Sequence, residues 1–239
     1  QSTLSSFELS TRLGGTPNSV SLDDLSLKLD DSSFSGKLAV TDLAKQALRV
    51  QLKGDKLDLD RYLPPQNQED GASAARKNEV KQVAAAAGAS GTTPLPSAPT
   101  QQAWSSEPLL PLETLRKLDI EAGIGLGELT LSKLPIEDAR IALTAKGGLI
   151  DLKELRGGLH GGEFAVRSRL DARPAVPVLT ANKQLKRIPV EKLIEARGEK
   201  APVRGELDLS ADVRTQGNSE KAWIDALNGT ASFSLSDGV

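Results

Sequence analysis

Large apolar residues recur at alternate positions through most of this 239-residue chain. Leu25, Leu27 and Leu29 form one such row, with Ser and Lys between them. A period of two places every apolar side chain on the same face of a β-strand. The polar residues in between leave the opposite face to water, which is typical of antiparallel sheets. The pattern therefore predicts a mainly β protein whose strands each have one dry and one wet face.

The clearest rows define the residues that we expect on the dry face. They are Phe7, Leu9, Leu25, Leu27, Leu29, Phe34, Leu38, Val40, Leu48, Val50, Leu52, Ile120, Ile124, Leu126, Leu129, Leu131, Ile141, Leu143, Phe164, Val166, Leu170, Leu207, Leu209, Val213, Phe233 and Leu235. This face is either the closed core of a sandwich or the lining of an open groove. Aromatic residues make up only 3% of the chain, fewer than a tight sheet-on-sheet core commonly uses. Leu also dominates where Val and Ile are the usual strand residues, and a flexible aliphatic lining favours acyl chains.

Three short segments have the signals of helices instead. Residues 111–118 begin with a proline, which suits the first turn of a helix. Residues 218–227 begin with Asn218 and Ser219, either of which can cap a helix, and Gly229 follows the end. Residues 190–196 are the third candidate.

Residues 64–108 differ in composition from the rest of the chain. They are rich in Ala, Ser, Gln, Gly and Pro and have no sustained strand periodicity. Such a composition buries too little apolar surface to offset the entropy of ordering. We therefore expect a flexible insert, with a marginal helix over 75–89, between a first β-rich block at 1–63 and a second at 109–239 that continues the same sheet.

The second block repeats part of the first. Residues 20–40 align with 150–170 at an offset of 130, so that Leu25 meets Leu155 and Phe34 meets Phe164. Each segment combines two alternating rows with a turn between them. A repeat of this kind predicts a sheet that grows by adding similar hairpins along one axis.

The polar residues do not form a recognisable catalytic or metal site. The chain has 30 Lys and Arg, 32 Asp and Glu, and no Cys, which argues against nucleic-acid binding and excludes thiol chemistry. His160 is the single histidine, and we interpret it as a turn or strand-end residue without a second His or Cys for catalysis or metal binding. The acidic stretches lack the spacing of a calcium-binding loop, and no glycine pattern for phosphate binding occurs. We expect neither an enzyme nor a cofactor.

The two ends of the chain do not look like natural termini. The first residues lack an initiator Met, a basic region and an apolar core, and both ends lie inside strand-like patterns. No apolar run reaches the ~20 residues of a transmembrane helix. We expect the chain to be a piece of a longer protein.

Three motifs suggest a family. The stretches "LDLDRYLP" at 57–64, "GLHGGEF" at 158–164 and "LNGTASFSLSDG" at 227–238 resemble the AsmA family of Gram-negative bacteria, and the resemblance covers nearly the whole chain except 64–108. His160 stands where an aromatic residue is frequent in the family. The resemblance implies a periplasmic location, an N-terminal inner-membrane anchor outside this sequence, and a role in outer-membrane biogenesis. It also implies a β-groove similar to that of chorein-type bridge proteins, which carry phospholipids.

Together the pattern and the resemblance predict an elongated, curved antiparallel sheet that forms an apolar groove, with a few short helices and a disordered insert. The expected partners are phospholipids, whose acyl chains the dry-face residues would shield at about 0.8 kcal/mol per CH₂, the inner membrane, and outer-membrane or periplasmic proteins. The alternative is a periplasmic scaffold or assembly factor for outer-membrane proteins that acts through exposed strand edges.

Overall fold

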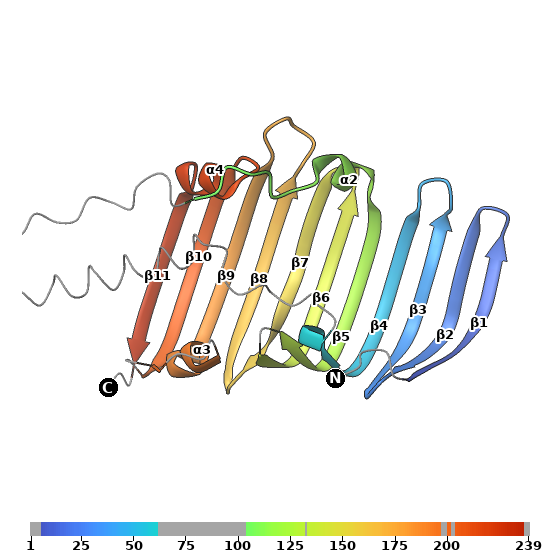
Figure 1. Cartoon of the computed structure of the whole chain (residues 1–239), viewed down its shortest axis with the longest axis horizontal. Coiled ribbons are helices and arrows are strands. Elements are labelled where there is room, and N and C mark those ends of the chain that lie inside the picture. Colours follow the sequence, from blue (N-terminus) through green and yellow to red (C-terminus); the bar gives the residue numbers. More distant parts are fainter. Residues whose placement is uncertain (1–5, 62–103, 132, 197–199, 202–203, 237–239) are drawn as a thin grey trace, which may run out of the picture.

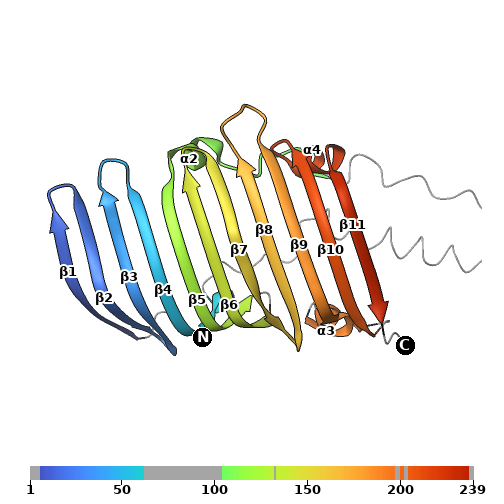
Figure 2. The ribbon, with the colours of Figure 1, turned by 180° about the vertical axis from the view of Figure 1, so that it is seen from behind.

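The computed structural model describes residues 6–61, 104–131, 133–196, 200–201 and 204–236. Its eleven strands form one curved, unclosed sheet in chain order (Figures 1 and 2). The strands are β1 (Phe7–Thr16), β2 (Ser19–Leu29), β3 (Ser32–Asp42), β4 (Ala47–Asp58), β5 (Asp119–Leu131), β6 (Leu134–Lys146), β7 (Leu149–Leu159), β8 (Gly162–Asp171), β9 (Val178–Pro189), β10 (Glu206–Gln216) and β11 (Asn228–Ser236). This arrangement confirms the predicted fold class.

One junction departs from the antiparallel pattern. β4 and β5 pair in parallel, with Leu48 opposite Ile120 and Leu57 opposite Leu129. A parallel pair needs a connection that returns to the starting end of the sheet. Residues 59–118 make this return, and they include the whole of the predicted insert at 64–108. All other neighbouring strands in the described sheet are antiparallel.

The three predicted helices are present at the ends of the strands. α2 (Leu112–Lys117) and α4 (Glu220–Asp225) lie at the upper edge in Figure 1, and α3 (Val190–Ala196) lies at the lower edge with the 3₁₀ turn η1 (Leu59–Arg61). Ser219 caps α4, because its Oγ accepts a hydrogen bond from the Ala222 backbone N–H at 3.1 Å. Short helices at both edges leave the two faces of the sheet without a helical layer among the described residues.

The predicted insert is only partly described. Residues 62–103, including the predicted helix at 75–89, lie outside the described residues. Residues 104–108 are described and run beside α4, where the Lys221 N–H donates to the Ser105 carbonyl at 3.0 Å. The next residues are also held, since the Leu110 N–H donates to Asn218 Oδ1 at 2.8 Å. The division of the chain into two blocks and an insert stays a prediction.

The hairpins β2–β3 and β7–β8 have the same backbone plan. Each has a two-residue loop, residues 30–31 and 160–161, whose first residue has a positive φ of 52° and 51°, respectively. Each also has a register shift at the same place, between Leu22 and Leu25 in β2 and between Leu152 and Leu155 in β7. The offset of 130 in the sequence therefore corresponds to matched bulges and matched turns.

The best-packed region lies in the middle of the sheet. Its buried members come from β5, β6, β7 and β9, and Leu193 of α3 packs against them. They are Leu126, Leu129, Ile136, Ala139, Leu159 and Ile188, and we call them the core cluster. The flanking strands β1 and β11 contribute no residue to it.

Candidate functional site

The strand register places most of the predicted dry-face residues on one face of the sheet. One ladder of paired residues runs from β1 to β6, steps over a register shift between β6 and β7, and continues to β11. Its members are Leu9, Leu27, Phe34, Gly54, Leu126, Ala139, Gly157, Phe164, Leu185, Leu209 and Phe233. Every member is apolar or glycine. We call the surface that contains this ladder the apolar face.

Bulges keep the apolar residues on this face. Leu22 and Leu25 are three positions apart, and strict alternation would turn one of them outward. The register shift between them absorbs the extra residue, and Asp24 adopts a φ of 51° there. The repeat hairpin solves the same problem between Leu152 and Leu155.

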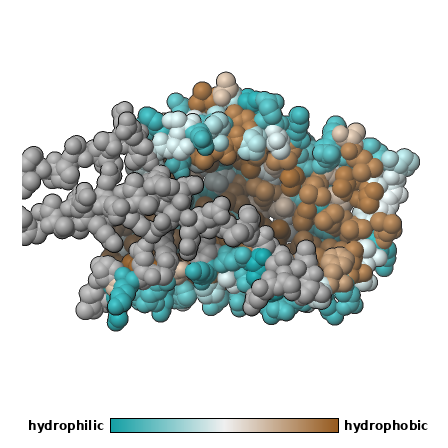
Figure 3. Space-filling view, viewed as in Figure 1, coloured by the Kyte–Doolittle hydropathy of each residue, from teal (hydrophilic) through white to brown (hydrophobic). Residues whose placement is uncertain are grey.

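The apolar face is open over much of its length. Every described strand belongs to the one sheet, so no second sheet of described residues covers it. Phe7 is 65% exposed at one end and Phe233 is 77% exposed at the other, whereas Leu129 in the core cluster is 3% exposed. Apolar side chains gather over β1–β4 and continue into the hollow at the middle of Figure 3. Such a surface combines a packed centre with two accessible flanks.

Two glycines in the ladder make room for phenylalanine rings. A Cβ on Gly54 would lie 2.8 Å from Phe34 Cδ1, and a Cβ on Gly157 would lie 3.3 Å from Phe164 Cε1. Both rings belong to the repeat hairpins, Phe34 to β3 and Phe164 to β8. Each ring packs over the bare backbone of the glycine that it faces. Each glycine thus lets an aromatic ring lie close to the backbone of the sheet.

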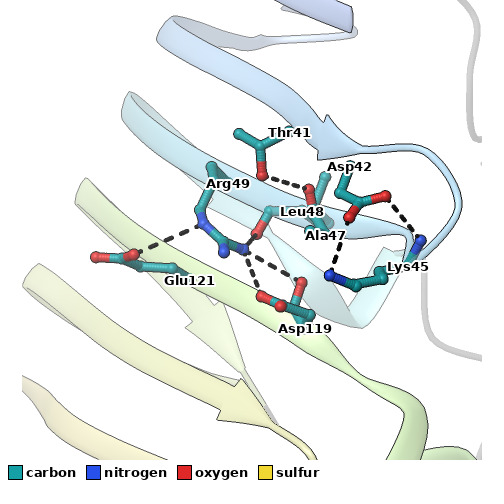
Figure 4. A network of polar contacts seen from close by, with 8 residues as sticks. All are labelled: Thr41, Asp42, Lys45, Ala47, Leu48, Arg49, Asp119 and Glu121. Carbon is teal, nitrogen blue, oxygen red and sulfur yellow. Dashed lines mark hydrogen bonds and ion pairs between the residues drawn. The ribbon is translucent and has the colours of Figure 1, made fainter. Parts of the chain in front are cut away.

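The opposite face is polar and carries the charged pairs. Arg49 links the parallel strands, with Nη1 2.8 Å from Asp119 Oδ1 and Nε 3.8 Å from Glu121 Oε2 (Figure 4). Its Nη1 also donates to the Asp119 backbone carbonyl at 3.3 Å. These contacts hold β4 against β5 at the parallel junction of the described sheet.

Two carboxylates near strand ends have lowered pKa values. Side-chain hydrogen bonds from Arg173, at 2.8 Å from Nε and 2.6 Å from Nη2, lower the pKa of Asp171 to about 2. A hydrogen bond from the backbone N–H of Lys45 is the main cause that lowers the pKa of Asp42. Both carboxylates stay ionised at neutral pH, and their hydrogen bonds hold the loops that follow the strands.

The described residues contain no cluster of three His, Cys, Asp or Glu side chains with the geometry of a metal site. His160 lies in the tight turn between β7 and β8, with a φ of 51°. None of the described helices has both the length and the apolar character needed to cross a bilayer. We therefore take the apolar face as the candidate functional site.

Sequence reasoning missed one strand of this face. β9 was absent from the predicted rows because its alternation is weak: Leu179 and Leu185 are separated by Ala181 and Lys183. The register shows the strand clearly, since Leu185 pairs with both Phe164 and Leu209. Whether the predicted dry-face residues bind lipid stays a prediction.

Comparison with known proteins agrees with the motifs. Residues 1–239 match the AsmA family. The chain is similar to Protein AsmA of Escherichia coli strain K12, with 22% identity over 193 residues. The aligned part is 81% of this chain and 29% of that relative, so the chain spans less than a third of its length. No solved structure matches.

Proposed function

This chain belongs to the AsmA family, and we propose that it is a non-enzymatic periplasmic segment that binds phospholipid acyl chains on its apolar face. In this role it aids lipid transport between the inner and outer membranes and so contributes to outer-membrane biogenesis. In the longer protein it is attached to the inner membrane. Family membership supports the general role in outer-membrane assembly or lipid transport.

The observation that carries the proposal is the continuous apolar ladder on an open sheet. Moving a phospholipid through water exposes its tails, at about 0.8 kcal/mol per CH₂, which sums to roughly 10 kcal/mol for one acyl chain. The ladder offers each tail an aliphatic surface from β1 to β11. The accessible flanks at Phe7 and Phe233 give tails a way onto that surface.

Photo-crosslinking tests which face contacts lipid. Leu143 lies on the apolar face of β6, because it pairs with Ala122 and Leu152. Its neighbour Thr144 is equally half-buried but lies on the polar face. A photoreactive residue at Leu143 should form lipid adducts in cells or with vesicles, and the same residue at Thr144 should not. Equal labelling at both positions, or none at either, would argue against the proposal.

A charge on the apolar face tests whether that face is open. Leu143→Asp should keep the fold, by circular dichroism and thermal melting, and lose co-purifying phospholipid in native mass spectrometry, because acyl chains cannot cover an unpaired carboxylate. Thr144→Asp should keep both fold and lipid. If Leu143→Asp unfolds the protein while Thr144→Asp does not, the face is a closed core and the lipid role is wrong.

A second candidate is the scaffold for outer-membrane proteins. The observation in its favour is that all nine residues of the edge strand β11 are exposed, and an exposed edge can pair with a strand of another protein. Consistently lipid-free, monodisperse protein that captures unfolded outer-membrane strands would favour this role over lipid binding.

A further inference from the structure

One charged side chain stands within the apolar face. Along β9 the positions on this face are Leu179, Ala181, Lys183 and Leu185, and Lys183 pairs with Val166 on β8 and Ala211 on β10. This second row of paired residues continues from Ala211 to Ala231 on β11. Of the regularly paired positions on this face in β7–β11, Lys183 holds the only charged side chain.

We propose that Lys183 binds the anionic phosphate of an amphiphile whose tails lie on the apolar face. This inference rests on the proposed function, and it adds the class of lipid that the face selects. The tails would run from β8 toward the larger side chains of β1–β7, and the phosphate would lie over β8–β11.

Among the described residues, Lys183 has no carboxylate partner that would explain its position. The described residues place no carboxylate in ion-pair contact with its side chain, which is exposed. Two lysines on the opposite face do have such a partner, since Lys37 Nζ lies 3.5 Å from Asp23 and Lys28 Nζ lies 3.4 Å from Glu8. The hollows of the polar face near β9 are lined by Asn182, Gln184 and other residues, but not by Lys183.

The ammonium group also cannot escape to the edge of the sheet. Lys183 is near the middle of β9, which runs from Val178 to Pro189. At about 3.3 Å per residue it is roughly 17–20 Å from either end of the strand, farther than a lysine stem extends. A purely apolar ligand that covers this position would therefore bury an unpaired charge, which is strongly unfavourable.

The surroundings leave room for a head group. Ala181, Ala211 and Ala231 are small, and Gly229 lies on the same face opposite Val213. Ser168 pairs with Ala181 and gives the face a hydroxyl donor next to the lysine. A phosphate oxygen could thus accept a charge-assisted hydrogen bond from Lys183 and a second bond from Ser168.

The test compares short-chain lipids that share their tails but differ in charge. Binding of dihexanoyl phosphatidic acid and of uncharged dihexanoylglycerol to the 239-residue chain would be measured by calorimetry below their aggregation concentrations. We expect the anionic lipid to bind roughly ten- to hundredfold more tightly. Lys183→Met should abolish this preference and leave binding of the uncharged lipid unchanged or improved. The matched control Lys186→Met, on the polar face of the same strand, should keep it.

Five outcomes would overturn the proposal. The first is that the preference survives in Lys183→Met. The second is that Lys183→Met loses both lipids together, which would mean a structural role. The third is that inorganic phosphate alone binds as tightly as the lipid in a Lys183-dependent way, and the ligand would then be free phosphate. If the native chain binds the uncharged lipid without preference, only this inference fails. If it binds neither lipid, the proposed function fails with it.

Discussion

The two repeat hairpins have one backbone plan and two environments. Leu29 ends β2 and Leu159 ends β7, each directly before a two-residue loop. Leu159 is 7% exposed and belongs to the core cluster, whereas Leu29 is half-buried and pairs with Phe7 on the edge strand β1. The repeated sequence therefore determines bulge and turn, while the neighbouring strands determine burial. The same leucine contributes to stability in one copy and to an accessible surface in the other.

The largest expected effect on stability comes from placing a charge at the two equivalent leucines. Leu159→Asp places a carboxylate inside the core cluster and should cost several kcal/mol out of a typical ~5–15, so the domain should unfold or melt far lower. Leu29→Asp should leave a folded protein, because water reaches its side chain. Urea denaturation followed by circular dichroism measures both. Equal losses would mean that the first hairpin is as closed as the second.

Alanine substitutions at two glycines should change the stability less, and in opposite directions. A Cβ on Gly157 would lie 2.5 Å from Ile136 Cγ2 and 3.0 Å from the Glu137 carbonyl, so Gly157→Ala should cost about 1–3 kcal/mol. A Cβ on Gly123 meets nothing within 4 Å, so Gly123→Ala should stabilise by about 0.4–1 kcal/mol. Thermal melts of the two variants check this. A destabilised Gly123→Ala would show that the open polar side of β5 is in contact with something.

The alternation of apolar residues was enough to predict the faces of the sheet but not its irregularities. The rows through Leu27 and Leu209 lie on one face as expected. The parallel β4–β5 pair was not predictable, because alternation says nothing about which end of a strand the chain returns to. β9 was missed because Lys183 occupies a position where the pattern expects an aliphatic residue, and that same exception became the candidate phosphate site.

Acid titration separates two carboxylates that end equivalent strands, Asp42 as the last residue of β3 and Asp171 as the last residue of β8. The pKa of Asp171 is about 2, below its ordinary value of 3.8, so its stabilising contribution is complete above pH 3.8 and is lost as the pH falls through 2. Arg173→Gln should raise the pKa of Asp171 toward 3.8. Lys45→Gln should leave the pKa of Asp42 lowered, since a backbone N–H is the main cause there. Carboxyl NMR titration of both variants measures the difference, and a full return of Asp42 to 3.8 would contradict it.

The smallest effect concerns the two turns. His160 adopts a φ of 51°, which costs a residue with a side chain more than it costs glycine, so His160→Gly should be neutral or stabilise by a few tenths of a kcal/mol. Asp30→Gly should instead destabilise slightly, because Asp30 Oδ1 accepts a hydrogen bond from the Ser6 N–H at 3.1 Å. Chemical denaturation resolves the two signs. Lipid binding should be unchanged in His160→Gly, and a loss of binding would give this turn a role that its geometry does not indicate.

The parallel junction has a consequence for the order in which the chain folds. Most neighbouring strands are joined by connections of a few residues, such as 172–177 between β8 and β9, whereas β4 and β5 meet only after residues 59–118 have been brought back along the sheet. Closing a loop about ten times longer costs roughly 2 kcal/mol more in chain entropy, and non-local pairing slows folding. The strands on each side of the junction can pair through their own hairpins first, so we expect two refolding phases. The slower phase should lengthen when the Arg49–Asp119 clamp is removed.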